Sequence, residues 1–399
     1  MCFAYNKCSK IERRCVTVIK GFVIRIYPTT EQKKKFFAHI GCSRYIWNHM
    51  LELQQNRHSK GLKHLSAYDM MNLLTPLKND GEHDWLYDVS ATSIKNVCQD
   101  LAEAYKNFFN KKHGYPKFKS KKKAKPAYPV RSEHFYFADE QYLHIEKVGK
   151  VKYKTDFSFP AGRNAVKYSN VRVTYNPLKD RWYISFGIDC ENQATVLTDK
   201  PLGIDLGIKN LAIAAYDDKC LVFVNINKSA QIRRLKKNIK HIQRSISRKY
   251  EANKVDKKFV KTNNIAREEE KLRALWNRLT NIRMNYIHQT THKLVSLLPS
   301  KVIMEDLNIK GMMKNRHLSQ SIGEQCWGEF IRQMKYKCEW LNIPFFQADR
   351  FYASSKICSC CGHKKNNLKL KDRIYHCEHC GTTIDRDFNA ALNLSRYVI

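Results

Sequence analysis

The amino-acid sequence predicts a multidomain α/β protein, in which an antiparallel β-barrel precedes a mixed β-sheet that is flanked by helices. Three observations predict this fold class. Residues 134–190 alternate polar and apolar positions between short turns. From Pro201 onward, apolar strand-like runs are separated by long helical stretches. Two Cys-x-x-Cys pairs then stand close to the C-terminus and indicate a small inserted module.

The composition indicates a partner that is a polyanion. The 399 residues contain 72 Lys and Arg against 37 acidic residues, a net charge of +35. Such a surplus fits nucleic-acid phosphates, although a generically basic protein is the plain alternative. A hydrophobic content of 43% excludes a wholly disordered chain. No apolar run of membrane-spanning length and no signal-peptide pattern is present, so we expect no membrane association and a cytoplasmic location.

The N-terminal half begins with a basic arm over residues 1–20 and a strand from Phe22 to Tyr27, which Pro28 ends. Thr29 followed by Gln32 is a capping-box pattern that predicts a helix start. Apolar residues at helical spacing then predict three helices, over about 31–55, 66–77 and 91–109. We therefore expect residues 29–110 to form a helical subdomain inserted into a barrel made of residues 21–28 and 111–199.

The segment KKHGYPKFKSKKKAK (111–125) contains eight lysines in fifteen residues, together with Tyr115 and Phe118. A solvated linker is one interpretation. The other is a segment that follows a nucleic-acid backbone, with its aromatic rings stacked on bases. The candidate nucleic-acid-binding residues here are Lys111, Lys112, Lys117, Lys119, Lys121, Lys122 and Lys123.

After residue 200 the pattern predicts three strands, a helix pair over 228–298 and a buried strand at 301–309. A helix over 323–341, a strand at 343–347, the cysteine segment and a final helix follow. Three acids stand out in this region: Asp205 inside the apolar run LGIDLGI, Glu305 at the end of KVIME, and Asp387 before FNAALNL. Each has a structural alternative: a core pair with Lys for Asp205, a solvated strand end for Glu305, and an N-cap for Asp387.

Considered together, the three acids predict a metal site. Carboxylates at the ends of neighbouring strands and at a helix start can converge, and they then repel one another unless cations neutralise them. Hard cations, chiefly Mg²⁺, prefer such oxygen ligands, and two ions would support phosphodiester hydrolysis. No Ser-His-Asp or P-loop pattern competes with this interpretation.

The cysteines Cys358, Cys361, Cys377 and Cys380 have the spacing of a zinc ribbon. We expect one structural Zn²⁺, because four thiolates complete its coordination shell. The extra Cys360 could replace Cys361 or be redox-active. Three flanking histidines could also substitute for a cysteine: His363, His376 and His379.

Several of these stretches together resemble the TnpB proteins of insertion sequences, relatives of the compact type V CRISPR nucleases. The similarity covers nearly the whole chain from about Gly21 and rests on RIYPTTEQ, GCSRYIWNHML, GYPKFKSKKK, GIDLGIKNLAIAA, IMEDLNIKGM, SSKICSCCG and CGTTIDRDFNAALNL. It implies an RNase H-like (RuvC) nuclease fold over 200–353 and 385–399, with a zinc ribbon over 354–384. It also implies that the N-terminal barrel is a wedge domain carrying helical recognition elements.

The resemblance further implies an RNA-guided DNA endonuclease that needs Mg²⁺, with a guide RNA from the transposon end and double-stranded target DNA beside a short adjacent motif. Asp205, Glu305 and Asp387 match the acidic triad, whereas Asp385 is left either as a group that supports the metal ligands without binding the metal or as a helix cap. We expect one protein monomer per RNA. Three residues on one helix face are candidates for reading the adjacent motif: Lys95, Asn96 and Gln99. A non-catalytic zinc-ribbon regulator and a DNA-joining transposase are the alternative functions.

Overall fold

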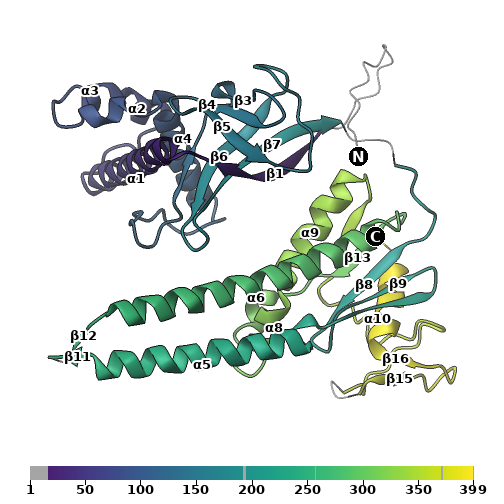
Figure 1. The fold of residues 1–399 in the computed structure, drawn as a ribbon. Helices are drawn as coiled ribbons and strands as arrows, with labels where there is room; N and C mark the ends of the chain where they lie inside the picture. The colour runs from purple at the N-terminus through teal and green to yellow at the C-terminus, as the bar shows by residue number, and fades with distance from the viewer. Residues whose placement is uncertain (1–16, 192–194, 257, 370–371, 399) are drawn as a thin grey trace, which may run out of the picture. The chain divides into compact units, whose positions relative to one another are not determined.

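The computed structural model describes residues 17–191, 195–256, 258–369 and 372–398. The chain divides into two compact units, Met1–Glu191 and Asn192–Ile399, which are described separately (Figure 1). Of the predicted basic arm, residues 1–16 lie outside the described residues, and the remainder begins the first strand, β1 (Thr17–Tyr27). None of the helices in the described ranges is long and apolar enough to cross a membrane.

The N-terminal unit contains a seven-stranded sheet in the order β2-β6-β7-β1-β5-β4-β3, in which all pairs are antiparallel. Its other strands are β2 (Ala127–Pro129), β3 (Phe135–Phe137), β4 (Tyr142–Ile145), β5 (Gly149–Lys154), β6 (Tyr168–Asn176) and β7 (Arg181–Glu191). β1 lies in the middle, between β7 and β5. The expectation that the first strand completes a sheet formed after residue 110 is therefore confirmed.

This sheet curls around one aromatic core. Phe135 of β3 and Tyr168 of β6 have ring centroids 4.9 Å apart, although the two strands stand near opposite ends of the strand order. Trp182, Tyr128 and Phe36 are buried in the same core. The curl gives the barrel-like antiparallel arrangement that the alternating sequence predicted.

The helices of this unit follow β1 and pack on one another in a separate core. They are α1 (Thr30–Ser59), α2 (Ala67–Asn72), α3 (Leu74–Lys78) and α4 (Ala91–Phe109), with a 3-10 turn at Asp84–Tyr87. The predicted capping box is present, because Thr29 Oγ1 accepts from the Gln32 amide and Gln32 Oε1 accepts from the Thr29 amide. The single helix expected over 66–77 is wrong. It breaks at Leu73, because Pro76 has no N–H with which to continue the ladder.

The C-terminal unit contains a five-stranded sheet in the order β10-β9-β8-β13-β14. The strands β10, β9 and β8 are antiparallel neighbours, whereas β13 is parallel to both β8 and β14. These strands are β8 (Leu202–Leu206), β9 (Asn210–Tyr216), β10 (Lys219–Val224), β13 (Val302–Glu305) and β14 (Phe345–Ala348). Two short hairpins are β11 (Lys254–Val255) with β12 (Lys258–Phe259), and β15 (Ile374–His376) with β16 (Thr383–Asp385).

Helices cover both faces of this mixed sheet, as the sequence predicted. They are α5 (Ala230–Ala252), α6 (Asn263–Val295), α7 (Ile309–Met312), α8 (Ser319–Gln325), α9 (Trp327–Trp340) and α10 (Arg386–Ser395). The expected helix pair over 228–298 is confirmed as α5 and α6, which lie side by side (Figure 1). The helix expected over 323–341 is in fact two helices, because Cys326 adopts a left-handed backbone with φ 53°. The predicted strand at 301–309 ends at Glu305.

Candidate functional site

Strand alternation places Asp205 and Glu305 on the same face of the C-terminal sheet. Leu202, Ile204 and Leu206 of β8 are buried on the opposite face, in the core that α6 and α9 cover. β13 runs parallel to β8 with Met304 opposite Ile204, so the next pair in this register is Glu305 and Asp205. The two acids therefore stand side by side at the carboxyl ends of neighbouring strands.

A glycine in β8 brings the last helix onto this face. A Cβ atom on Gly203 would lie 2.1 Å from the carbonyl oxygen of Ala391 and 2.3 Å from the amide nitrogen of Ser395, so no side chain fits there. α10 consequently packs directly on the backbone of β8, with Asp387 in its first turn. The sequence analysis did not single out Gly203. The signal in the sequence was the position of this glycine. Gly203 lies two residues before Asp205, so the two residues are on the same face of the strand.

The electrostatics of this face agree with three carboxylates in proximity. Burial, and then the charges of Glu305 and Asp387, hold the pKa of Asp205 well above its usual range. The pKa of Glu305 is also raised, by burial and by Asp387, although a hydrogen bond from Ser354 opposes the rise. Within the described ranges the Asp205 side chain has no hydrogen bond and no ion pair, so the alternative of a core pair with Lys is wrong.

The acids at the start of α10 have different roles. The Asp385 carboxylate accepts hydrogen bonds from the amides of Asp387, at 3.0 Å, and Phe388, at 3.1 Å, so Asp385 is the N-cap. The alternative that Asp387 is the N-cap is therefore wrong. Its carboxylate instead pairs with Arg386 at 2.9 Å and lies 3.9 Å from Arg373.

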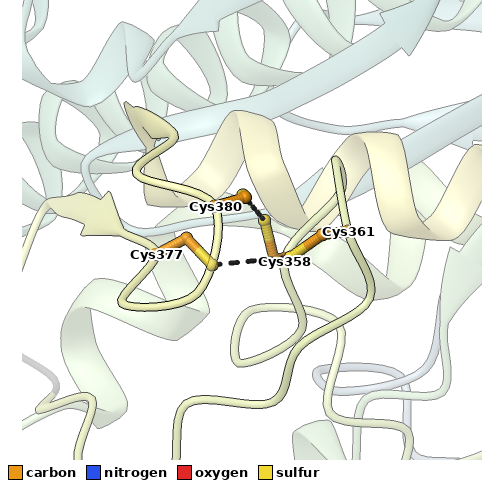
Figure 2. Close-up of side chains that lie close together, drawn as sticks. All are labelled: Cys358, Cys361, Cys377 and Cys380. Carbon is orange, nitrogen blue, oxygen red and sulfur yellow. Dashed lines mark hydrogen bonds between the residues drawn. The ribbon is translucent and has the colours of Figure 1, made fainter.

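The four predicted cysteines form a second centre (Figure 2). Among the described residues, they are the one group of three or more His, Cys, Asp or Glu whose ligand atoms all lie within 4.8 Å of one another. The sulfur atoms of Cys358 and Cys380 are 3.6 Å apart, as are those of Cys361 and Cys377. Tetrahedral thiolates around zinc stand about 3.8 Å apart and disulfide sulfurs about 2 Å apart, so the spacing fits a zinc site.

The surroundings of the cysteines also suit a metal. Gly362 and Gly381 follow the second cysteine of each pair with φ 76° and 73°, a backbone that favours glycine. Hydrogen bonds from Thr382 lower the pKa of Cys380 to about 5, whereas burial and the neighbouring sulfurs raise the pKa values of Cys358 and Cys361, so one thiolate is favoured and shares its charge with the other sulfurs. Cys360 and the three flanking histidines are not members of the set.

Two buried asparagines connect the cysteine centre to the acidic face. Asn393 of α10 donates to the carbonyl oxygens of Ser354, at 2.7 Å, and Ile357, at 2.6 Å. Asn389, one turn earlier, donates to the same Ile357 oxygen at 2.7 Å. The Ser354 hydroxyl in turn donates to Glu305. The sequence analysis missed this network, although two asparagines four residues apart in an otherwise apolar helix were a signal for it.

The lysine-rich segment 111–125 belongs to the N-terminal unit and is fastened to α1. Trp47 Nε1 donates to the Lys117 carbonyl at 3.0 Å, and Asn48 exchanges hydrogen bonds with the Lys119 backbone. The Lys119 amine lies 3.3 Å from the centre of the Trp47 ring, and burial lowers its pKa to about 8. Lys119 is therefore turned into the protein, whereas the other candidates of this segment are exposed: Lys111, Lys112, Lys117, Lys121, Lys122 and Lys123.

The motif-reading candidates lie on α4, as expected. Lys95 and Gln99 are exposed one turn apart and Asn96 is half-buried beside them. The opposite side of α4 is buried, with Ile94, Val97 and Leu101 in the helical core. The three residues therefore share the solvent-facing side of the helix.

Three family models match this chain. They are described as "Helix-turn-helix domain" over residues 18–63, "Probable transposase" over 185–316 and "Cas12f1-like, TNB domain" over 327–394. In this structure the first of these regions is strand β1 followed by the single helix α1. The third contains the four cysteines, Asp387 and most of α10.

Known proteins resemble the chain over most of its length. A "Putative RNA-guided DNA endonuclease" of Streptomyces pristinaespiralis is 28% identical over 94% of this chain and 89% of its own. The similarly named InsQ of Escherichia coli K12 is 27% identical over 94% of this chain and 91% of its own. A solved Cas12f1–sgRNA–target DNA complex aligns with 95% of this chain and 99% of that chain, at 16% identity and a TM-score of 0.37. By the matched domains and these relatives, the chain is similar to the TnpB (IS605 OrfB) proteins.

Proposed function

We propose that this protein is an RNA-guided DNA endonuclease of an insertion sequence. The observation that carries the proposal is the placement of Asp205, Glu305 and Asp387 on one face of the C-terminal sheet, with raised pKa values for the first two. The names of the relatives support the reaction class. The net charge of +35 supports a nucleic-acid substrate.

We infer an RNase H-like (RuvC) fold for the C-terminal sheet. Its support is the strand order, with three antiparallel strands in succession and then two parallel strands beside the first. In this proposal residues 200–353 and 385–399 form the nuclease domain and residues 354–384 the zinc ribbon. The curled N-terminal sheet is then the wedge domain, and residues 29–110 are the recognition helices.

The three carboxylates are proposed as the catalytic residues. Their oxygen donors suit Mg²⁺, and two such ions when bound would activate a water molecule and neutralise the leaving oxygen. Asp205 and Glu305 are held by neighbouring strands, so their separation is fixed by the sheet. The Ser354 hydroxyl orients Glu305, and Arg386 holds Asp387 in place.

The four cysteines are proposed to hold one structural Zn²⁺. The first knuckle follows the segment that carries Ser354, and the second leads directly into α10. A closed zinc site would therefore fix the chain on both sides of the acidic face. It would take no part in the chemistry, because four thiolates leave no coordination position for a substrate.

The proposed partners are a guide RNA from the transposon end and a double-stranded DNA target. The exposed lysines of segment 111–125 lie beside Phe118, which is 53% exposed and free to stack on a base. The solvent-facing side of α4, with Lys95, Asn96 and Gln99, is proposed to contact the motif beside the target. One protein monomer per RNA remains a prediction.

The test is a reconstitution. The protein would be purified with RNA transcribed from the region downstream of its own gene and given plasmids with a guide-matched target beside randomised sequence. We expect Mg²⁺-dependent cleavage that disappears after RNase treatment of the complex and in Asp205→Ala. Asp156→Ala, which removes an exposed acid of the N-terminal unit, should cleave normally.

Other outcomes would support the alternative functions. Unchanged function in Asp205→Ala would indicate a zinc-ribbon regulator without catalysis. Joined DNA ends formed without RNA would indicate a transposase. Either result would refute the proposal.

A further inference from the structure

Phe351 presents an aromatic ring to solvent just after the last strand of the C-terminal sheet. The residue is 89% exposed, and no other large apolar residue in the described ranges is more exposed. A single exposed apolar residue is ordinary on a protein surface, so the exposure alone indicates nothing. Phe351 is distinguished by the turn that carries it and by the contacts on either side of that turn.

The turn is fixed by its own hydrogen bonds. The Tyr352 amide donates to the Asp349 carbonyl at 3.0 Å, which closes a β-turn, and the Phe351 amide donates to the Asp349 carboxylate at 2.8 Å. The next ring, that of Tyr352, packs 4.8 Å from the ring of Tyr397. In the part of the chain that the structure describes, the Phe351 ring pairs with no other ring or cation. The backbone of Phe351 is therefore held while its ring is free.

Contacts on both sides place this turn beside Glu305. β14 runs parallel to β13, so the turn that follows β14 begins at the edge of the sheet where Glu305 ends β13. On one side of Phe351, Arg350 Nε donates at 3.0 Å to Asp306, the next residue after Glu305. On the other side, Ser354 donates to Glu305 itself. Phe351 is thus fixed at the margin of the acidic face.

The surroundings of the ring suit a nucleobase better than a protein partner. The centre of a protein interface is depleted of charged residues, whereas Asp349 and Arg350 beside Phe351 are both charged and exposed. A nucleobase needs only one flat face for stacking. In a duplex the neighbouring bases cover that face, so the stacked base must be unpaired. The ion pair of Arg350 with Asp306 also neutralises an acid that would otherwise repel the phosphates of the strand.

We propose that Phe351 binds the strand that is cut, by stacking its ring on one unpaired base close to the scissile phosphate. The turn is fastened to Asp306 and Glu305, so the stacked base has a fixed position relative to the carboxylates. Stacking does not select a base, because every base has an aromatic face. Phe351 therefore helps to set where the strand is cut and does not read its sequence. This inference rests on the proposed nuclease function of the three carboxylates.

The first experiment measures single-turnover cleavage by the full-length, zinc-loaded protein with its RNA. The targets carry one abasic site at successive positions around the cut. For the wild type we expect one position at which loss of the base slows cleavage about tenfold or more, the effect typical of losing a stacked base. Phe351→Ala should slow cleavage of the intact target by a similar factor, and the same abasic site should then have little further effect. A structural defect would slow all targets equally.

Three other variants separate stacking from packing. Phe351→Tyr keeps an aromatic ring and should cleave at close to the wild-type rate, with the same sensitivity to the abasic site. Phe351→Leu keeps apolar volume without a ring and should behave like Phe351→Ala. Phe259→Ala removes an exposed ring from the hairpin of β11 and β12, at the end of the helix pair away from the sheet (Figure 1). This control should match the wild type with every target.

The second experiment detects the contact without cleavage. The zinc-loaded protein is mixed with Ca²⁺ and a single-stranded DNA that contains one 5-iodouracil, a base that forms a covalent bond on irradiation with an aromatic side chain stacked on it. Mass spectrometry of the digested protein then locates the cross-link. We expect a cross-link at Phe351 that is retained in Phe351→Tyr and lost in Phe351→Ala and Phe351→Leu.

Two results would overturn this proposal: an abasic site that slows wild type and Phe351→Ala equally at every position, or the absence of a cross-link at position 351. A protein that forms the cross-link but cuts no target would support the contact and refute the proposed nuclease function. A protein that cuts its target without the cross-link would retain the nuclease function and refute the contact. The two failures are therefore distinguishable.

Discussion

The Ser354 hydroxyl donates a hydrogen bond to the carboxylate of Glu305, 49 residues away along the chain. Ser354 is 2% exposed, and its own carbonyl is held by Asn393 of α10. The segment that leads into the first cysteine knuckle is thus fastened both to an acid of the sheet and to the helix that carries Asp387. The two candidate metal centres are connected by this network.

Ser354→Ala should weaken divalent-metal binding while the fold persists. Loss of the hydroxyl leaves a half-buried carboxylate without the group that orients it, and losses of this kind typically reduce metal affinity about tenfold or more. The measurement is titration of the zinc-loaded protein with Mn²⁺, followed by electron paramagnetic resonance. Ser355→Ala, which changes the adjacent half-buried serine, is the matched control and should bind Mn²⁺ normally. Equal affinities in the two variants would contradict a positioning role for Ser354.

Gly203→Ala should displace α10. The added methyl group would overlap backbone atoms of Ala391 and Ser395, which cannot move independently of the helix. We expect a loss of about 1–3 kcal/mol in the free energy of unfolding, together with a loss of cleavage as Asp387 moves away from the strands. Urea denaturation and plasmid cleavage measure the two effects. Gly328→Ala, in α9, where a Cβ would meet nothing within 4 Å and alanine favours the helix, should lower neither stability nor cleavage.

Cys377→Ser should abolish zinc binding, and Cys360→Ser should not. Cys377 is fully buried within the four-sulfur set, whereas Cys360 is exposed and outside it. Elemental analysis of the purified proteins should give close to one zinc per chain for the wild type and for Cys360→Ser. If Cys360→Ser lost its zinc, the assignment of the ligands would be wrong.

The metal-free protein should become less stable as the pH rises, because of Asp205. Its pKa in the folded state is raised above the ordinary value of 3.8, so the folded protein holds a proton that the unfolded chain releases. The stability from this group is complete below about pH 4 and is lost as the pH rises toward the folded pKa. Asp205→Asn cannot ionise, so its stability relative to wild type should grow as the pH rises from about 4 toward the folded-state pKa of Asp205, at about 1.4 kcal/mol per unit of pKa shift.

Urea denaturation in Mg²⁺-free buffer at several pH values measures this difference. Asp156→Asn, at an exposed position, should follow the wild-type curve throughout. A difference between Asp205→Asn and wild type that does not vary with pH would show that Asp205 ionises freely in the folded protein. Added Mg²⁺ should stabilise the wild type at pH 8 and have little effect on Asp205→Asn.

Much of the local structure could be predicted because short-range physics decides it. The capping box of Thr29 and Gln32 fixes where α1 begins, and the cysteine spacing fixes the composition of the four-sulfur cluster. The alternation in LGIDL also determines that Asp205 faces away from the apolar side chains beside it. Each of these signals is either a short run of neighbouring residues or a metal-ligand spacing. None of them depends on the rest of the fold.

Only the tertiary structure decided the features that depend on contacts between residues far apart in the sequence. The need for glycine at position 203 arises from a helix almost 190 residues later, and the burial of Lys119 depends on where Trp47 lies. Asp385 and Asp387 have the same chemistry, and only the geometry of α10 separates the cap from the carboxylate that faces the strands. The sequence by itself determined which residues are the candidates for the chemistry. The packing of α10 on β8 and β13 decided which of them meet, because contacts between distant segments follow from the whole core and not from local pattern.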